Sequence, residues 1–183
     1  PQPNIYHTFT YGNYLNQYLR DYKVFVDPRE SIFLDEAKLV LKAFRSPEAL
    51  NSIVRQFNIQ TILVKIPETR FIQGYGFLDL IEAFFPKEYW ALVFFDEISI
   101  VVLKRIPAHQ KTIEQFEYKY LKPNLPHFLL FQEHKDHSVF KEELDRCFKL
   151  MPENFYGLLA NSTYARLYND QSKIEEIKPI LSK

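Results

Sequence analysis

Two stretches near the start of the chain carry residues that could bind an anion or a sugar. Tyr11 and Gly12 follow a short apolar segment, and Asp27 and Arg29 end the next one. A strand, a glycine turn and a helix would place helix N-terminal amides at the carboxyl edge of a sheet, where such amides attract anions. Dinucleotide-binding folds hold a ribose with an acidic residue at the end of the second strand. The candidate ligand-binding residues are therefore Tyr11, Gly12, Tyr14, Asp27 and Arg29.

Each of these residues also has a purely structural interpretation. The sequence around Gly12 lacks both G-x-G-x-x-G and the Lys-Ser/Thr of a P-loop, so the glycine could serve only a tight turn. Asp27 and Arg29 lie two residues apart and could form a salt bridge that fixes the strand end at Pro28. If no ligand binds here, we expect Asp27 and Arg29 to be bonded to each other or to the neighbouring loops.

Other patterns that carry chemistry are absent from the sequence or incomplete. His134 and His137 have a spacing that could hold a metal on a helix, but no third ligand is evident and H-E-x-x-H is absent. His7 lies within the first strand, where we expect a packed, hydrogen-bonded side chain. Cys147 is the single cysteine, which excludes an intrachain disulfide and favours a buried apolar role. We therefore predict no catalytic residue, no metal site and no cofactor.

Composition places the chain among globular proteins and argues against two functional classes. Of its 183 residues, 46% are hydrophobic and 25% are charged, which suits one sizeable core. The 23 basic and 23 acidic side chains cancel, which argues against a nucleic-acid-binding module. The most apolar stretch, residues 90–106, is interrupted by Asp96-Glu97 and is not a membrane span. The chain begins at Pro1 without a signal peptide, which we interpret as the start of an excised domain.

Strands and helices are expected to alternate as far as Ile106. The predicted strands are Ile5–Phe9, Lys23–Asp27, Thr61–Ile66, Trp90–Phe95 and Ile98–Ile106. The predicted helices are one after the Gly12 turn, one over Phe33–Phe44, one begun by Ser46-Pro47 and one over Phe77–Phe84. This order predicts a three-layer, Rossmann-like α/β domain over residues 1–106. Its mixed sheet would have about five strands, the early ones parallel and the last two an antiparallel hairpin at an edge.

The pattern changes after Pro107. We expect Thr112–Leu121 to be helical, followed by a break at Pro123–Pro126 and then further helices, so residues 107–183 form a helical extension. The helices after Leu150 weakly resemble tetratricopeptide hairpins, although Asn161 and Arg166 lie where that repeat prefers apolar residues. One repeat does not bury its own apolar face, so these helices should pack on the α/β domain or on a partner.

Four short motifs in the first 106 residues occur together in a known kind of domain. They are Tyr11-Gly12-Asn13-Tyr14-Leu15, Val24-Phe25-Val26-Asp27-Pro28-Arg29, Phe57-Asn58-Ile59 and Trp90 through Val102. Together they resemble the C-terminal extramembrane domain of polytopic membrane proteins similar to the GT-C glycosyltransferases, which use polyprenyl-phosphate sugars. Two glycines of the family pattern are replaced by Asn13 and Asn58, and asparagine also tolerates a positive φ.

The resemblance implies an auxiliary role for this chain. In such proteins the catalytic carboxylate lies on loops between membrane helices, so the chain would not be the catalytic centre. It would be an extracytoplasmic domain, periplasmic or extracellular, attached to the membrane through a missing N-terminal part. Its partner would be the membrane-embedded part of its own chain or another membrane protein. It would contribute to binding a partner, a sugar or a polyprenyl-phosphate substrate.

Two alternative functions remain open at the level of sequence. The first is a free-standing Rossmann-like domain that binds a nucleotide or sugar phosphate at Tyr11, Gly12, Asp27 and Arg29. The second is a protein-interaction module that uses the helices after Pro123.

Overall fold

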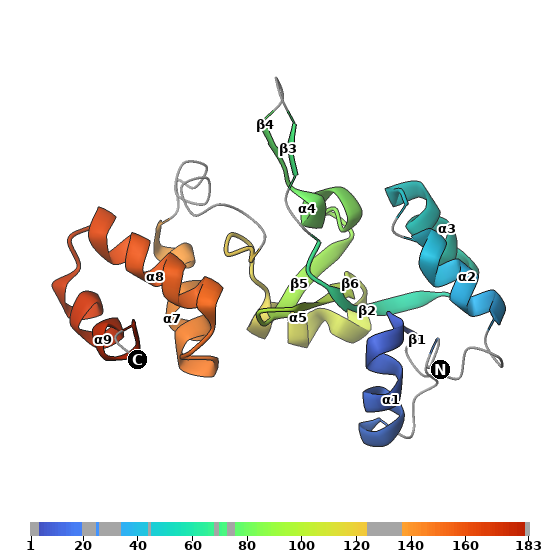
Figure 1. Ribbon diagram of the computed structural model, residues 1–183, viewed down its shortest axis with the longest axis horizontal. Coiled ribbons are helices and arrows are strands. Elements are labelled where there is room, and N and C mark those ends of the chain that lie inside the picture. The colour runs from blue at the N-terminus through green and yellow to red at the C-terminus, as the bar shows by residue number, and fades with distance from the viewer. Residues whose placement is uncertain are drawn as a thin grey trace.

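A four-stranded mixed sheet forms the centre of the structure, which is a computed structural model that describes residues 4–19, 25, 34–43, 45–67, 70–72, 76–123 and 137–181. The strands are β1 (Asn4–His7), β2 (Ile59–Lys65), β5 (Trp90–Phe95) and β6 (Ser99–Lys104). Their order is β1-β2-β6-β5, with β1 parallel to β2 and the other pairs antiparallel (Figure 1). The predicted α/β class is therefore confirmed. The predicted strand Lys23–Asp27 lies outside the described residues, apart from Phe25.

Helices α2 (Leu34–Ala43) and α3 (Pro47–Gln56) precede the inner strand β2. The predicted start of α3 is confirmed, because the Ser46 hydroxyl accepts a hydrogen bond from the backbone N–H of Ala49 at 3.2 Å and Pro47 follows at the first helical position. After α3 the chain turns through Asn58, whose φ of 48° is the left-handed conformation that asparagine tolerates, whereas Asn13 lies within helix α1. β2 then lies between β1 and β6, inside the sheet as predicted.

The predicted turn at Gly12 is wrong. Helix α1 (Phe9–Tyr18) begins directly after Thr8, so Gly12 is its fourth residue. A single glycine weakens a helix by only about 1 kcal/mol, and the helical spacing of the apolar residues extends through it. Leu15 is buried on the inner side of α1, which supplies the packing that holds the helix in place.

The stretch from Pro67 to Phe84 also differs from the prediction. Instead of a loop up to Gly76 and a helix from Phe77, the chain forms a second, two-stranded sheet from β3 (Arg70–Ile72) and β4 (Gly76–Leu78). This hairpin projects away from the main sheet (Figure 1). Helix α4 (Leu80–Phe84) starts only at Asp79, whose carboxylate accepts the backbone N–H of Glu82 at 3.1 Å.

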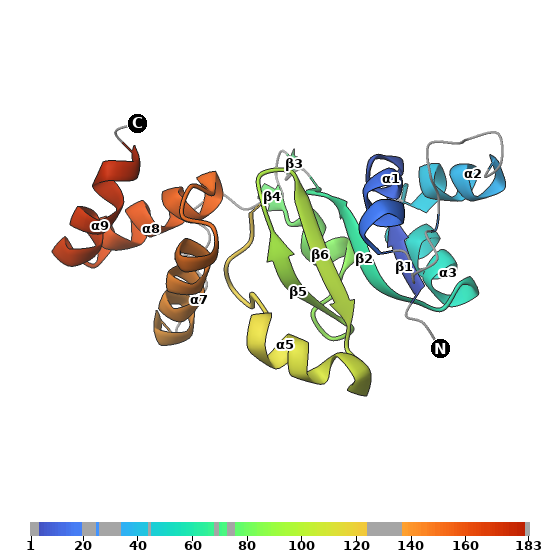
Figure 2. The ribbon, with the colours of Figure 1, turned by 90° about the horizontal axis from the view of Figure 1, so that it is seen from below.

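The β5–β6 hairpin forms as predicted, and its side chains alternate between two faces. Trp90 and Leu92 face the main core. Ala91 and Leu103 face the opposite way and form a small cluster with Ile113 of α5 (Gln110–Phe116). In Figure 2, α5 lies beneath the hairpin. β5 is an edge of the sheet among the described strands.

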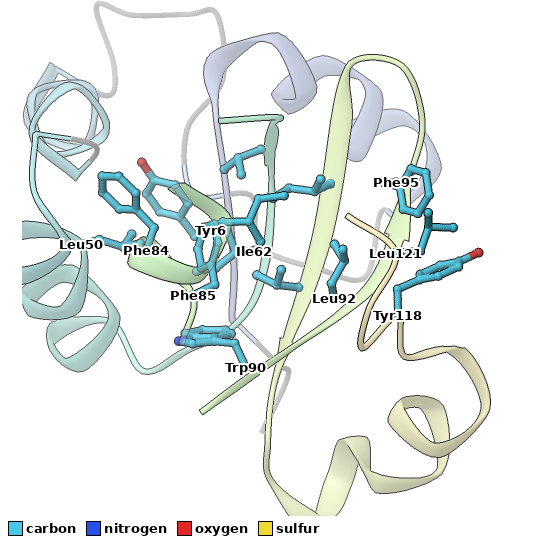
Figure 3. Close-up of a cluster of buried hydrophobic side chains, with 14 of the residues drawn as sticks. Tyr6, Leu50, Ile62, Phe84, Phe85, Trp90, Leu92, Phe95, Tyr118 and Leu121 are labelled. Atoms are coloured by element: carbon cyan, nitrogen blue, oxygen red, sulfur yellow. The ribbon is translucent and has the colours of Figure 1, made fainter. Parts of the chain in front are cut away.

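The main core is built from the other face of the sheet and from the helices packed on it. Tyr6 of β1, Ile62 of β2 and Phe95 of β5 are fully buried there. Figure 3 shows that side chains from α3, α4 and the chain after α5 complete the same cluster. Phe95 and Tyr118 make an edge-to-face contact with 4.9 Å between ring centroids. The core therefore reaches beyond residue 106.

Helix α5, which is preceded by a short 3₁₀ turn, η1 (Pro107–His109), is shorter than predicted. It ends at Phe116, whereas we expected a helix to Leu121. The residues after it, segment 117–122, run along the hairpin, and the backbone N–H of Tyr118 donates to the carbonyl of Leu92 at 2.7 Å. The extended conformation buries Tyr118 and Leu121, and this burial outweighs the helical spacing of the apolar residues in the sequence.

The C-terminal extension is helical as predicted, with α7 (His137–Leu150), α8 (Phe155–Leu167) and α9 (Gln171–Leu181). These helices lie at the opposite end of the molecule from α2 and α3 (Figures 1 and 2). Phe140 and Leu144 belong to the same buried cluster as the sheet, so α7 packs on the α/β part of the chain. Within the described residues, none of the helices combines the length and the apolarity needed to cross a bilayer.

Candidate functional site

Of the residues predicted to bind a ligand, the structure describes Tyr11, Gly12 and Tyr14, and these three do not face a common site. The Tyr11 hydroxyl lies 2.5 Å from the hydroxyl of Ser99 and ties α1 to the start of β6. Gly12 is buried within α1, whereas Tyr14 is 60% exposed and stacks on Tyr18 with 4.5 Å between ring centroids. Asp27 and Arg29 lie outside the described residues. Tyr11 thus has a structural partner, and Tyr14 points to solvent rather than toward a shared site.

The structure tests the predictions made for His7 and Cys147 but not the one made for His134. His7 is fully buried, and its Nε2 accepts the backbone N–H of Phe25 at 3.0 Å, which confirms the prediction of a packed, hydrogen-bonded residue. Cys147 is buried, also as predicted, and burial raises the pKa of its thiol to about 12. His134 lies outside the described residues, and the part of the chain that is described contains no group of three potential metal ligands.

A pocket that the sequence did not predict opens on the main-core face of the hairpin. It has a volume of about 410 Å³ and lies between α4 on one side and segment 117–122 on the other. We call it the β5–β6 pocket. Its floor is formed by five apolar side chains, all of them less than a tenth exposed: Ile81, Phe85, Trp90, Leu92 and Val102.

The floor offers a rigid aromatic surface. Trp90 is the single tryptophan of the chain, and its indole meets Phe85 edge-to-face with 6.1 Å between ring centroids. Tyr118 and Tyr120 line the wall formed by segment 117–122. Aromatic side chains with a few convergent polar groups are the usual lining of a small-molecule site.

Lys122 closes one side of the pocket through two ion pairs with α4. Its ammonium lies 2.7 Å from a carboxylate oxygen of Asp79 and 2.9 Å from one of Glu82. Burial alone would lower the pKa of Lys122, but the two carboxylates raise it above its usual value. Burial would likewise raise the pKa of Glu82, and the hydrogen bond from Lys122 lowers it instead. Lys122 and Glu82 therefore stabilise each other's charged forms, and Lys122 also satisfies the carboxylate of Asp79.

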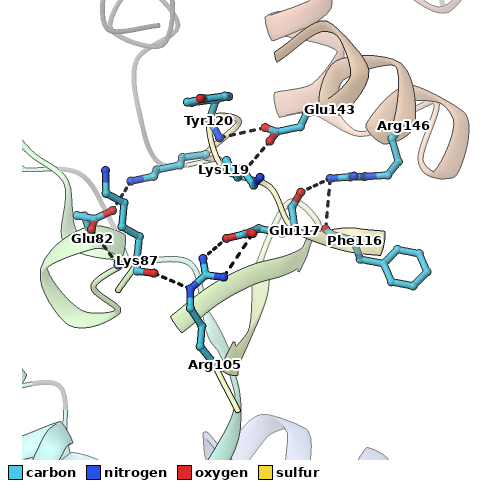
Figure 4. Close-up of polar contacts among 10 residues, drawn as sticks. Glu82, Lys87, Arg105, Phe116, Glu117, Lys119, Tyr120, Glu143 and Arg146 are labelled. Atoms are coloured by element: carbon cyan, nitrogen blue, oxygen red, sulfur yellow. Dashed lines mark hydrogen bonds and ion pairs between the residues drawn. The ribbon is translucent and has the colours of Figure 1, made fainter. Parts of the chain in front are cut away.

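Arg105 is held on the other side of the pocket. Its Nε donates to the backbone carbonyl of Lys87 at 2.6 Å, and its two terminal nitrogens contact the carboxylate of Glu117 (Figure 4). This two-pronged geometry fixes the guanidinium and uses the charge of Glu117. The pair links the strand end after β6 to segment 117–122.

These pairings leave a positive surplus around the pocket. Four cationic and two anionic side chains line it, and the carboxylate of Asp79, which is paired with Lys122, adds a third negative charge, so the net charge is 4 − 3 = +1. Both carboxylates of the lining are already paired, Glu82 with Lys122 and Glu117 with Arg105. Among the described residues, no ion pair involves the ammonium of Lys87 or Lys119. The whole chain has a formal charge of zero, which makes this local surplus distinctive.

The pocket wall is anchored by α7. The buried carboxylate of Glu143 accepts the backbone N–H groups of Lys119, Tyr120 and Leu121 at 2.7, 3.0 and 2.9 Å. Figure 4 shows Glu143 beside Lys119 and Tyr120. Burial raises the pKa of Glu143, although these three hydrogen bonds oppose the increase. Arg146 donates to the carbonyls of Phe116 and Glu117 and lies over the Tyr118 ring, 4.4 Å from its centroid. Segment 117–122 is thus fixed through its backbone.

Sequence reasoning missed this site because its residues are far apart in the chain. The one local signal is the run Glu117-Tyr118-Lys119-Tyr120-Leu121-Lys122, in which apolar and charged residues partly alternate. Alternation is typical of an extended segment with one buried side, whereas the apolar spacing over Thr112–Leu121 predicts a helix.

Comparison with known proteins adds no relative to this description. The chain gives no significant match to any protein-family model, to any curated protein or to any solved structure.

Proposed function

We propose that this chain is a non-catalytic binding domain of a larger integral membrane protein that resembles the GT-C glycosyltransferases. In this proposal the domain lies on the extracytoplasmic side and has an α/β part with a three-layer, Rossmann-like sheet of about five strands. It assists the membrane-embedded part in binding a substrate or a partner and leaves the chemistry to that part.

Three of the four sequence motifs lie within the described residues and support the proposal through the structural roles of their residues. Tyr11 of the first motif is hydrogen-bonded to Ser99 of the fourth, although 88 residues separate them. Asn58 of the third motif has the positive φ that its glycine counterpart would adopt. Residues that are scattered in sequence thus serve one sheet, as expected if the motifs mark a single domain type.

The β5–β6 pocket is the observation that carries the binding role. Trp90 opens the fourth motif and lies in the pocket floor, beside an uncompensated positive charge on the rim. The candidate residues Tyr11, Gly12 and Tyr14 do not converge in this way. We therefore assign ligand binding to this pocket rather than to the Gly12 region.

Fractionation of the full-length gene product tests the membrane assignment. An antibody raised against the 183-residue chain should detect the full-length protein in membranes that have been washed with alkaline carbonate. Protease added to intact cells stripped of their outer barrier should remove the antibody signal. Recovery of the protein in the soluble fraction would overturn the membrane assignment, and resistance to protease until the membrane is broken would overturn the extracytoplasmic one.

A second function, protein interaction through the helical extension, is favoured by one feature of α8. Phe155, Leu159 and Leu167 are 59%, 36% and 60% exposed and are spaced by multiples of four residues, so they share one side of the helix. In a pull-down from the native host, the double variant Phe155→Ser/Leu167→Ser should lose a partner that the wild type retains. Leu41→Ser, which changes an apolar residue 67% exposed on α2, is the matched control.

A further inference from the structure

We propose that the β5–β6 pocket binds a small molecule in which one anionic group is joined to a ring. The anionic group lies between the ammonium groups of Lys87 and Lys119, and the ring lies against the floor at Trp90. This inference rests on the binding role proposed above for the same pocket, but it does not depend on the membrane assignment, because it concerns the isolated chain.

The negative charge of the proposed ligand is inferred from the ion pairs that the charged side chains around the pocket form or lack. Arg105 and Lys122 each have carboxylate partners within the structure, so neither needs a ligand to compensate its charge. Lys87 and Lys119 have no ion pair among the described residues, and both line the pocket. They come from opposite sides, one from the turn after α4 and the other from segment 117–122 (Figure 4). An anion between them would be attracted from both sides, whereas a cation would be repelled.

The ring of the proposed ligand is inferred from the apolar side chains that form the pocket floor. Trp90 and Phe85 are almost fully buried and fixed by their mutual contact, so they form an apolar surface that does not need to rearrange. A planar or saturated ring placed on this floor removes its own apolar face from water, while the already buried Trp90 and Phe85 supply the contact surface. A volume of about 410 Å³ holds a single ring with its anionic substituent and is small for a dinucleotide.

Trp90 also provides the measurement, because it is the single tryptophan of the chain and lines the pocket. Its fluorescence in the 183-residue chain is followed during titration with phenyl phosphate, glucose 6-phosphate and glucuronate. Inorganic phosphate and glucose serve as probes that carry only the anion or only the ring. We expect a saturable change with the compounds that carry both features, and an affinity at least about tenfold lower with inorganic phosphate or glucose. The three ring compounds distinguish an aromatic ring from a sugar and a phosphate from a carboxylate.

Two variants test the assignment of the anion-binding residues. Lys87→Ala and Lys119→Ala should each weaken binding about tenfold, because each removes one of the two uncompensated charges. Both side chains are exposed and without ion pairs among the described residues, so the variants should unfold at the temperature of the wild type. Lys111→Ala, which removes an exposed lysine on α5 outside the pocket, is the matched control and should leave the affinity unchanged.

Three results would overturn the proposal. The first is that no ring compound changes Trp90 fluorescence in a saturable way. The second is that glucose or inorganic phosphate binds as tightly as the combined compounds, since either result removes one of the two required features. The third is that folded Lys87→Ala and Lys119→Ala bind as the control does. Because none of these measurements involves a membrane, failure here is distinct from failure of the fractionation experiment.

Discussion

The molecule contains two concave surfaces that are built around a lysine held by two carboxylates, yet they differ in net charge. In the β5–β6 pocket, Lys122 is paired with Asp79 and Glu82. In a second hollow of about 680 Å³ between α7 and α9, Lys173 lies 2.8 Å from Asp145 and 2.9 Å from Glu176. The charged residues that line the second hollow cancel: Lys141, Lys149 and Lys173 against Asp145, Asp170 and Glu176.

This difference indicates which hollow is suited to a ligand. The α7–α9 hollow is the larger of the two, but Lys173 is almost fully buried over the Phe148 ring and serves to join two helices. The smaller β5–β6 pocket has an apolar floor and two ammonium groups that the protein itself does not compensate. Volume alone would favour the α7–α9 hollow, whereas the positive surplus favours the β5–β6 pocket as the ligand site.

The largest effect is expected where the two regions meet, at Glu143. Glu143→Ala removes three hydrogen bonds from segment 117–122 and leaves three partly or fully buried donors without this acceptor, so the free energy of unfolding should fall by about 3 kcal/mol. Urea denaturation measures this loss. Glu142→Ala, on the exposed side of α7, is the control and should change stability by about 0.5 kcal/mol or less. An equal effect of the two variants would mean that α7 does not hold the pocket wall.

A steric variant probes the packing of α7 against α8. A Cβ atom at Gly157 would lie 2.7 Å from the Sγ of Cys147, so Gly157→Ala should reduce the free energy of unfolding by about 2 kcal/mol. The double variant Gly157→Ala/Cys147→Ala removes the clash and should be less destabilised than the sum of the single variants. Thermal and urea denaturation of all four proteins complete the cycle. Strict additivity would contradict the close packing of α7 on α8.

Replacing the central lysine of each hollow compares the two directly. Lys122→Met strands Asp79 and Glu82 in a partly buried position and should cost about 2 kcal/mol of stability. Lys173→Met should cost about 1 kcal/mol, because Asp145 keeps its ion pair with Lys141 and Glu176 is half exposed. Only the first variant should also weaken the binding of phenyl phosphate, which fluorescence titration would detect. The reverse order of stabilities would show that burial of Lys173 outweighs the number of stranded charges.

The smallest effect concerns pH. Glu82 and Asp145 have pKa values lowered in the folded state, so the stability they contribute is present above their unfolded pKa values and is lost as the pH falls. Glu143 has a raised pKa, so its contribution has the opposite sign and increases as the pH falls through that raised pKa. Glu143→Gln removes this opposing contribution to the pH dependence and, because an amide nitrogen cannot accept a hydrogen bond, also lowers stability by a pH-independent amount. Stability should therefore fall more steeply in the variant than in the wild type between about pH 7 and about pH 4.5, by about 1 kcal/mol or less, in urea denaturation at each pH.

A parallel or shallower acid profile for Glu143→Gln would contradict the direction assigned to the pKa of Glu143. Glu142→Gln is again the matched control, since this neighbouring carboxylate is exposed on the same helix.

Local patterns predicted the elements well and the pocket not at all. Ser46 and Pro47 mark the start of α3, and Asn58 marks the turn after it, because capping and positive φ depend on a few neighbouring residues. The turn at Gly12 failed because the preference of glycine for turns is weaker than the packing of the helix around it. The pocket depends on contacts such as Lys122 with Glu82, 40 residues apart. No periodicity or motif within a single segment contains such a contact.

The way segment 117–122 is attached has a consequence for how the protein could diversify. Glu143 and Arg146 bind peptide N–H and carbonyl groups that every sequence presents, proline N–H groups excepted. Substitutions at positions 119 and 120 would therefore leave these anchoring bonds intact while they change the wall that faces a ligand. Mutation could alter the selectivity of this surface without a compensating change elsewhere, as loops on a rigid scaffold do in binding proteins whose specificity evolves rapidly.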